Sequence, residues 1–278
     1  MTTQAGGTVK DFMHRYLEVA PPDTTAVFAA ERMAARRVGS LLVESADPKR
    51  GLPGIVTETD LVRKVLAAEL DPTVTMVDQV MAGPIVTIPA ERSMLDASHL
   101  METHHVRHLG VVEGRDIVGL VSVRDLVRSF VDAESGPVCA LDDVYRPLSV
   151  LMATTLGTIR SEESLLVAAQ QMREKRIGSL LVIEAGEIVG IVTESDLVRK
   201  GLASNRNPGG TRVSAVVSAP LIAIDINRTI RDASQVMAEQ GVRHLAVREN
   251  GKIVGLLSIR DLVKMVSVRD RPRFLGNT

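Results

Sequence analysis

Residues 190–200 read GIVTESDLVRK, and three further copies of this pattern occur in the chain. They read GIVTETDLVRK at 54–64, GLVSVRDLVRS at 119–129 and GLLSIRDLVKM at 255–265. Each copy, called a signature, contains a glycine, two apolar residues, a hydroxyl residue, two variable residues, an aspartate and Leu-Val. Four copies indicate internal repeats, which have to be identified before single helices and strands are assigned.

The spacing of the signatures groups the repeats into two pairs. Consecutive signature aspartates are 65, 71 and 65 residues apart, at Asp60, Asp125, Asp196 and Asp261. An apolar landmark residue ends a short segment well upstream of each aspartate, at Met13, Met81, Met152 and Val217. Repeats one and three share GSLLV, whereas repeats two and four share VRHL. The repeats therefore follow an A-B-A-B order, and the longer middle interval contains the boundary between two modules.

These intervals divide the 278 residues into seven predicted segments. The four repeats are expected at 8–70, 75–131, 147–204 and 212–268. The other segments are an N-terminal tail at 1–7, an inter-module linker at 132–146 and a C-terminal tail at 269–278. Repeat one is longer than the others because of a loop at 45–53 that contains Pro and Gly. A turn accommodates such an insertion at low entropic cost.

Each repeat is predicted to be a β-α-β-β-α unit. First strands are expected at 85–88, ended by Pro89, and at 221–224, because these segments are short, apolar and rich in β-branched residues. Second strands are expected at 40–43, 108–112, 179–183 and 244–247. Turns at Gly114, Gly186 and Gly251 then lead into third strands such as 188–192, and a helix starts at each signature. One unit leaves its sheet face uncovered, so the prediction is an α/β fold of paired repeats.

The first helix of each repeat carries an apolar stripe at positions i, i+3 and i+7 that ends in methionine in every copy. The stripes are Ala26, Ala29, Met33; Met94, Ala97, Met101; Leu165, Ala168, Met172; and Ile230, Ala233, Met237. A metal-binding methionine cluster is the alternative interpretation. The helical spacing favours a buried face.

Composition excludes several classes of protein. The net charge is -1, aromatic residues make up 2% and tryptophan is absent, which argues against nucleic-acid binding. No apolar run approaches the roughly 20 residues of a membrane span. The first residues do not resemble a signal peptide, so a cytoplasmic protein is expected. The single cysteine, Cys139, lies in the predicted linker and is interpreted as incidental.

The signature allows two interpretations that are compatible with each other. Thr193 and Asp196 have the spacing of a capping box, in which each side chain satisfies a backbone amide at a helix start. The same helix start also forms an anion site, since free amides and the helix dipole favour negative charge. A hydroxyl group can donate to a phosphate, and a carboxylate can accept from the two hydroxyls of a ribose. The ligand interpretation therefore points to a nucleotide.

These residues make the chain resemble the CBS domain family, named after cystathionine β-synthase, over about residues 8–268. The resemblance implies four CBS repeats paired into two Bateman modules, which stack as a flat disc, and adenosine-containing ligands such as AMP, ADP, ATP or S-adenosylmethionine. It implies ribose contacts from Asp60, Asp125, Asp196 and Asp261. It implies phosphate contacts from Thr57, Ser122, Thr193 and Ser258, with the backbone of the first strands reading the adenine edge.

The A and B repeats differ in charge beside the hydroxyl residue. Repeats one and three place Glu58 and Glu194 there, whereas repeats two and four place an apolar residue followed by Arg124 or Arg260. The B repeats also carry an arginine where the A repeats have a glycine, namely Arg107 and Arg243 against Gly39 and Gly178. In one interpretation the charged residues lie solvated on the surface. In the other, the B sites favour anionic phosphates and the A sites bind them less well.

The histidines suggest a metal site at first sight. His104, His105 and His108 are close in sequence, but His108 and His244 occupy one repeat position at a strand start, and cysteine partners are absent. Structural or surface roles are favoured. No recurring nucleophile–base pair or P-loop is present, so neither catalytic residues nor metal ligands are assigned.

The predicted function is a stand-alone, non-enzymatic sensor related to energy sensing. It would bind an adenosine-containing ligand, require no other cofactor, and act on an unidentified protein partner by a conformational shift. Nucleic-acid and membrane partners are not expected, and a homodimer is compatible with the resemblance. The alternative is an interaction or scaffold protein whose signatures serve only as helix caps. An enzyme is a third, less favoured class.

Overall fold

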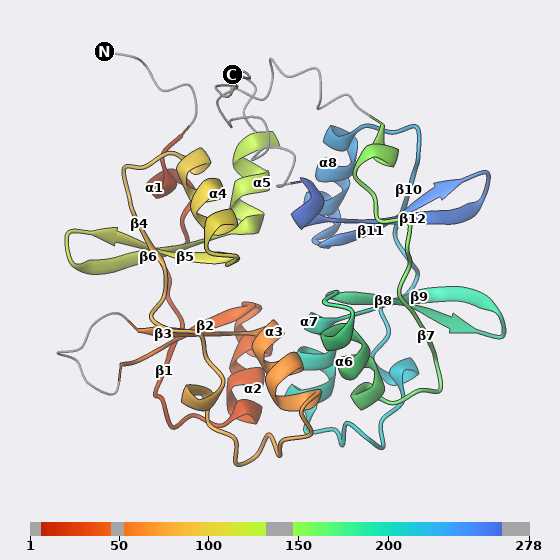
Figure 1. Ribbon diagram of the computed structural model, residues 1–278, viewed down its shortest axis with the longest axis horizontal. Coiled ribbons are helices and arrows are strands. Elements are labelled where there is room, and N and C mark those ends of the chain that lie inside the picture. The colour runs from red at the N-terminus through yellow and green to blue at the C-terminus, as the bar shows by residue number, and fades with distance from the viewer. Residues whose placement is uncertain (1–6, 46–52, 132–146, 263–278) are drawn as a thin grey trace, which may run out of the picture. The chain divides into compact units, whose positions relative to one another are not determined.

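The structure, a computed structural model, describes residues 7–45, 53–131 and 147–262. The predictions for both tails and for the linker with Cys139 concern residues outside these ranges, as does most of the predicted loop at 45–53. Within the described chain, each repeat contains one three-stranded sheet (Figure 1). The first strand is parallel to the second and the second is antiparallel to the third.

The strands follow the same order in every repeat. They are β1 (Val19–Ala20), β2 (Ser40–Val43) and β3 (Gly54–Thr57); β4 (Thr87–Pro89), β5 (His108–Glu113) and β6 (Asp116–Ser122); β7 (Thr158–Arg160), β8 (Ser179–Glu184) and β9 (Glu187–Thr193); and β10 (Ala223–Asp225), β11 (His244–Glu249) and β12 (Lys252–Ser258). The second strands begin at the predicted residues. The first strands β4 and β10 begin two residues later than predicted, because regular pairing starts at Thr87 and Ala223. Pro89 lies within β4, an edge strand that tolerates a missing N–H.

The hairpin turns form as predicted. Gly114, Gly186 and Gly251 all have positive φ, at 65°, 88° and 80°. Ala185 precedes Gly186 with φ 50°, so both central residues of the turn between β8 and β9 are left-handed. Two-residue hairpins favour this conformation because its twist matches that of the strands.

The helices that follow the first strands bury the predicted stripes. They are α2 (Ala26–Arg36), α4 (Met94–Thr103), α6 (Leu165–Glu174) and α8 (Ile230–Gln240). Every stripe residue is at most 6% exposed. This burial confirms core packing as the role of the recurring methionines.

The described chain forms two compact units. Unit 1 comprises Met1–Tyr16, Val86–Thr155 and Ile222–Thr278 and holds the sheets of repeats two and four. Unit 2 comprises Leu17–Ile85 and Leu156–Leu221 and holds the sheets of repeats one and three. Each unit therefore brings together two repeats of one type, B in unit 1 and A in unit 2.

Consecutive repeats exchange their first segments. Four short stretches, called crossing segments, span residues 8–14, 76–82, 147–153 and 212–218 and contain the short helices α1 (Val9–Phe12), η2 (Val77–Gln79), η4 (Leu148–Val150) and η7 (Val213–Ala215). Each crossing segment ends with a bridge to the third strand of the other repeat of its pair: His14 to Leu120, Ala82 to Ile55, Ala153 to Leu256 and Ser218 to Ile191. These bridges link repeat one to two and repeat three to four, whereas the compact units group repeat one with three and repeat two with four.

The crossing segments explain both the signature glycines and the landmark residues. A Cβ atom at Gly119 would overlap the sulfur of Met13, and Gly54 and Gly255 face Met81 and Met152 in the same way. At Gly190 a Cβ atom would lie 2.6 Å from the carbonyl oxygen of Ser218 and 2.7 Å from Cγ2 of Val217. The glycine is therefore needed for the close approach of a crossing segment.

The signature helices differ between the two repeat types. In repeat two the helix is α5 (Val123–Val131), whereas α3 (Glu58–Asp60) and α7 (Glu194–Asp196) continue as the π-helices η1 (Leu61–Leu66) and η5 (Leu197–Gly201), the latter followed by η6 (Leu202–Ser204). The amide of Ala67 donates to the carbonyl of Val62, five residues back, at 2.8 Å. This wider winding was not predicted. It brings Leu61, Val62, Val65 and Leu66 into the core together.

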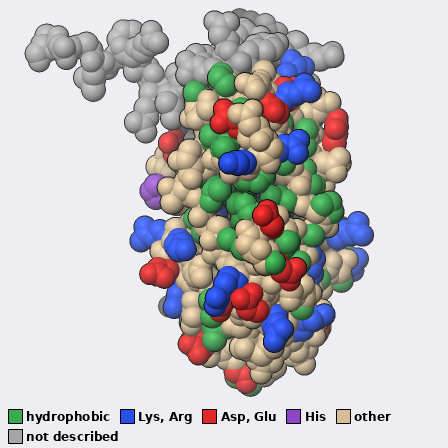
Figure 2. Space-filling view, turned by 90° about the vertical axis from the view of Figure 1, so that its right-hand side faces the viewer, with side chains coloured by type: hydrophobic (Ala, Val, Ile, Leu, Met, Phe, Trp, Pro, Cys, Tyr) green, Lys and Arg blue, Asp and Glu red, His purple; other side chains and the backbone are tan. Residues whose placement is uncertain are grey.

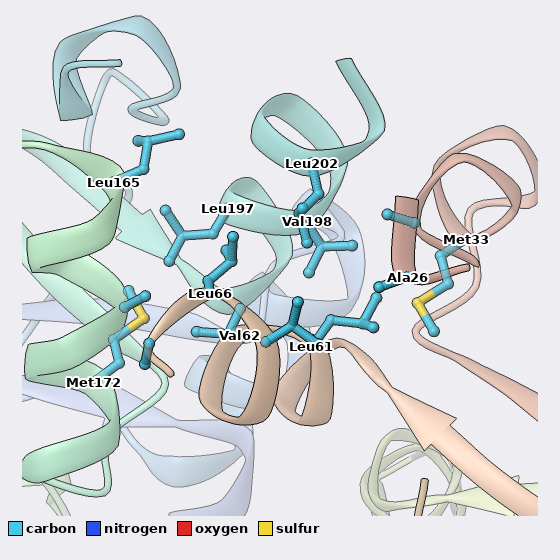
Figure 3. Packing of buried hydrophobic residues seen from close by; sticks show 14 of the residues in the cluster. Ala26, Met33, Leu61, Val62, Leu66, Leu165, Met172, Leu197, Val198 and Leu202 are labelled. Carbon is cyan, nitrogen blue, oxygen red and sulfur yellow. The ribbon is translucent and has the colours of Figure 1, made fainter. Parts of the chain in front are cut away.

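The core of unit 2 includes residues from both of its signature helices. Leu61, Val62 and Leu66 of repeat one point toward Leu197, Val198 and Leu202 of repeat three (Figure 3). These side chains are at most 3% exposed. Burying such residues stabilises a fold by about 1.5–3 kcal/mol each relative to full exposure. The apolar Leu-Val of the signature therefore fixes how repeats one and three pack within unit 2.

Unit 1 has two apolar clusters, one for each repeat. Leu109 and Val121 belong to the cluster of repeat two, and Leu245 and Leu257 to that of repeat four. Ile259, the residue after the hydroxyl in the fourth signature, packs against both clusters. The apolar residue that distinguishes the B signatures therefore contributes to joining the two repeats.

The described surface has no long apolar element. No helix in this part of the chain is long and apolar enough to cross a membrane. On the face shown in Figure 2, cationic and anionic side chains are interspersed. This mixture agrees with the net charge of -1.

Candidate functional site

The four signatures form helix caps with one shared geometry. The aspartate Oδ2 atom accepts from the backbone amide and from the hydroxyl of the residue three positions earlier. The amide and hydroxyl distances are 3.0 and 2.6 Å for Thr57–Asp60, 2.8 and 2.7 Å for Ser122–Asp125, 2.9 and 2.6 Å for Thr193–Asp196, and 2.9 and 2.6 Å for Ser258–Asp261. The capping interpretation is therefore confirmed. Each hydroxyl group already donates to its own aspartate, so contact with a phosphate would require it to rotate.

The second carboxylate oxygen, Oδ1, has different partners in different repeats. In the A repeats, Lys64 lies 2.8 Å from Asp60 Oδ1, and Lys200 lies 2.8 Å from Asp196 Oδ1. In repeat two, Nε2 of His14 lies 3.0 Å from Asp125 Oδ1. The Oδ2 atom thus maintains the helix start, whereas Oδ1 is the atom whose surroundings vary.

Unit 2 holds two buried glutamates in a reciprocal network. Glu58 and Glu194 are 3% and 5% exposed. Glu58 accepts from Arg199 Nε at 2.9 Å and from the Ser195 hydroxyl at 2.8 Å. Glu194 accepts from Arg63 Nε at 3.1 Å and from the Thr59 hydroxyl at 2.6 Å. Each glutamate therefore ties its own signature to the signature of the other A repeat.

This network corrects the interpretation of the A-repeat glutamates as solvated surface groups. In that interpretation the carboxylates are hydrated, whereas the structure gives them tertiary contacts between repeats one and three. The arginines complete the network through the backbone, because Arg63 donates to the Ile177 carbonyl at 3.3 Å and Arg199 to the Val38 carbonyl at 3.2 Å. One feature of the sequence marks this network. Glutamate, hydroxyl residue and arginine occur together only in the two A signatures.

In unit 1, arginine side chains place positive charge near the hydroxyl residues of the two B signatures. His108 pairs with Ser122 across β5 and β6, and His244 pairs with Ser258 across β11 and β12. Burial together with the guanidinium groups of Arg107, Arg124 and Arg243 lowers the pKa of His108 to about 3. Burial and the guanidinium groups of Arg243, Arg260 and Arg107 likewise lower the pKa of His244 to about 3.

The sequence-predicted arginines of the two B repeats are thus close enough to act on one another's histidines. Arg243 of repeat four lowers the pKa of His108 in repeat two, and Arg107 of repeat two lowers that of His244 in repeat four. Because both rings stay neutral at physiological pH, the positive charge at this place comes from the arginines. This arrangement suits an anion bound near the signatures of unit 1.

The two B-repeat histidines, His108 and His244, are expected to show no titration in NMR spectra between pH 5 and 8. The low pKa values of about 3 predict neutral rings throughout this range. Below about pH 6.5 the unfolded protein binds more protons at these rings than the folded protein does, so stability decreases as the pH falls toward 3. The variants His108→Gln and His244→Gln assign the signals. Titration of either ring near pH 6.5 would contradict the electrostatic account.

The other metal candidates gain no support in the described chain. His104 and His105 are exposed at the end of α4. No group of three or more His, Cys, Asp or Glu side chains that could hold a metal ion occurs among the residues that the structure describes.

Comparison with known proteins agrees with the repeat structure. The family model of the CBS domain matches residues 9–67, 77–132, 148–203 and 213–268. The chain belongs to the CBS domain family. This match confirms the resemblance inferred from the four signatures.

Two curated relatives are named as CBS domain-containing proteins, and each extends beyond the matched region. CBSCBSPB2, a CBS domain-containing protein of Arabidopsis thaliana, is 28% identical over 251 residues, which are 81% of this chain and 46% of the relative. The CBS domain-containing protein YhcV of Bacillus subtilis is 32% identical over 111 residues, 40% of this chain and 79% of the relative. The chain spans about half the length of the Arabidopsis relatives.

Two solved structures have a similar fold over most of this chain. A protein of Methanocaldococcus jannaschii, described as a proposed archaeal homologue of γ-AMPK, aligns with a TM-score of 0.72 at 19% identity, over 93% of this chain and 99% of that one. An uncharacterised conserved protein of Pyrococcus horikoshii aligns with a TM-score of 0.60 at 19% identity, over 94% and 100%. At this identity the likeness establishes the fold.

Proposed function

We propose that this CBS protein is a regulatory protein that binds an adenosine-containing ligand at the signatures of unit 1. The observation that carries the proposal is the convergence of Arg107, Arg124, Arg243 and Arg260 on His108 and His244, beside the hydroxyl and aspartate of the B signatures. Guanidinium groups bind phosphate oxygens in a charge-assisted and often bidentate manner. A nearby carboxylate can accept from ribose hydroxyls.

The positive charge of the B-repeat arginines favours some of the candidate ligands over others. AMP, ADP and ATP carry phosphates that complement the arginines, whereas S-adenosylmethionine lacks a phosphate. The anionic nucleotides are therefore preferred, and S-adenosylmethionine remains the comparison ligand. No other cofactor enters the proposal.

Unit 2 is proposed to have a mainly structural role. The arginines of the A signatures are engaged by Glu58 and Glu194 within the fold. Lysines hold the Oδ1 atoms of Asp60 and Asp196 and also donate to the crossing segments, from Lys64 to the Val80 carbonyl at 2.6 Å and from Lys200 to the Val216 carbonyl at 3.1 Å. A ligand at an A signature would have to displace these contacts.

Regulation would proceed by a population shift. A ligand that binds one arrangement of the repeats more tightly than another favours that arrangement and its surface for a protein partner. The extent of the shift is limited by the difference between the two affinities. The alternative, a scaffold protein whose signatures act only as caps, predicts no ligand-dependent shift.

The four signature aspartates distinguish these possibilities. Asp125→Ala and Asp261→Ala are expected to weaken AMP or ATP binding about tenfold or more, a loss of about 1.4 kcal/mol or more, measured by isothermal titration calorimetry. Asp60→Ala and Asp196→Ala are the matched controls and are expected to have smaller effects on affinity. Equal losses, or larger losses at the A signatures, contradict the assignment to unit 1. Thermal-shift measurements with the four candidate ligands test the scaffold alternative, which predicts no stabilisation by any of them.

A further inference from the structure

The crossing segments place a different side chain beside each signature. The residue that follows the landmark residue, called the bridge residue, pairs with the strand that leads into the signature of the other repeat. The four bridge residues are His14, Ala82, Ala153 and Ser218. This position therefore varies among the four repeats, although the signature aspartate is constant.

Two bridge residues bind the signature aspartate directly. His14 Nε2 lies 3.0 Å from Oδ1 of Asp125, and the Ser218 hydroxyl donates to Oδ1 of Asp196 at 2.8 Å. Both contacts are made to Oδ1, because Oδ2 already accepts the hydrogen bonds of the helix cap. Ala82 and Ala153 carry only a methyl group and cannot form such a bond. The bridge residue thus determines whether the crossing segment forms a hydrogen bond with Oδ1 of the signature aspartate.

We infer that the bridge residue is a specificity-determining position, and that His14 makes ligand binding at Asp125 dependent on pH by competing with ligand hydroxyls for Oδ1. The inference rests on the proposed function, in which a hydroxyl-bearing ligand binds Asp125. His14 has an exposed side chain, at 66%, whereas Asp125 is 6% exposed. The imidazole therefore lies on the accessible side of a buried carboxylate, where a ligand would approach.

The charges around His14 set the direction of the pH effect. The hydrogen bond to Asp125 raises the pKa of His14, although partial burial and the positive charges of Arg124 and Arg128 oppose this. Burial alone would raise the pKa of Asp125, but the hydrogen bonds from His14 and Ser122 lower it overall. A ligand that takes Oδ1 removes the partner of His14, so the pKa of His14 falls and its proton is released. Ligand affinity therefore increases as pH rises through the interval between the pKa of His14 in the ligand-bound protein and its higher pKa in the free protein.

The test measures AMP binding at pH 6 and pH 8 by isothermal titration calorimetry in the full-length chain. An Asp261→Ala background isolates the Asp125 signature. His14→Gln keeps a hydrogen-bond donor but does not titrate. Because the phosphate of AMP itself titrates near pH 6, the quantity compared at each pH is the ratio of the affinities with His14 and with Gln at this position. That ratio is expected to rise from pH 6 to pH 8, roughly tenfold for each unit by which binding lowers the pKa of His14.

The Asp261 signature provides a matched control, since its bridge residue is Ala153. In an Asp125→Ala background, replacing His14 with Gln is expected to leave the pH dependence of AMP binding unchanged. If AMP binds but the His14-to-Gln ratio is the same at both pH values, the inference is overturned while the proposed function stands. If none of AMP, ADP, ATP or S-adenosylmethionine binds, the proposed function fails and this inference fails with it.

Discussion

Glu58→Ala is expected to lower the free energy of unfolding by about 3 kcal/mol, at the lower end of the range for breaking a buried ion pair. The substitution removes the acceptor of the Arg199 Nε bond at 2.9 Å and of the Ser195 hydroxyl at 2.8 Å. Glu58 is 3% exposed, so little water can replace the lost carboxylate. The Arg199 side chain is 28% exposed and keeps its bond to the Val38 carbonyl, which limits the loss.

Urea unfolding monitored by circular dichroism measures this effect. Glu162→Ala is the control, because the Glu162 side chain is 53% exposed and its contact with Arg160 lies on the surface; exposed pairs contribute about 0–1 kcal/mol. Glu194→Ala should match Glu58→Ala, since Arg63 and Thr59 repeat the same contacts. A double-mutant cycle with Arg199→Met should show a coupling energy of about 1–3 kcal/mol. Additive losses would disprove the direct pairing of Glu58 with Arg199.

The repeated parts of the fold could be predicted because they depend on local periodicity. Four signatures at regular intervals define the repeats, and apolar residues at i, i+3 and i+7 define the helix faces. Equivalent positions in the four repeats are expected to have the same secondary structure. The short segment 221–224 could therefore be assigned as a strand by comparison with 85–88. The predicted boundaries of β4 and β10 differ from the structure by two residues at the start, because the end of a strand depends on its hydrogen-bonded neighbours.

The partners of the signature residues could not be predicted because they come from distant parts of the chain. Glu58 and Arg199 are 141 residues apart, and His14 and Asp125 are 111 residues apart. The glutamate, hydroxyl residue and arginine shared by the A signatures mark a common feature, but they do not tell which distant residues pair with one another. Placement of Glu58 required the knowledge that repeat one packs against repeat three. The π-helical segments η1 and η5 likewise lie where Leu-Val residues of both repeats are buried in one shared core.

Gly190→Ala is expected to destabilise the protein by about 2 kcal/mol, within the range for inserting a methyl group into a well-packed core. The new Cβ atom would lie 2.6 Å from the Ser218 carbonyl oxygen. That carbonyl accepts from the Ile191 amide at 3.0 Å, and the Ser218 amide donates to the Ile191 carbonyl at 2.8 Å. The crossing segment cannot retreat without stretching both bonds and the contact of Ser218 with Asp196.

Gly54→Ala tests whether the clash with the backbone causes the loss of stability expected for Gly190→Ala. A Cβ atom at Gly54 meets mainly the flexible end of the Met81 side chain, and the nearest backbone atom, the Ala82 carbonyl oxygen, lies 3.2 Å away. Because a methionine side chain can adopt another rotamer, the expected loss is about 1 kcal/mol. Gly209→Ala is the control for the substitution itself, since the nearest atom to its Cβ would be 3.5 Å away. Urea unfolding should rank the losses as Gly190, Gly54 and Gly209. An equal loss at Gly190 and Gly54 would mean that the side chain of Met81 resists displacement as strongly as the hydrogen-bonded backbone does.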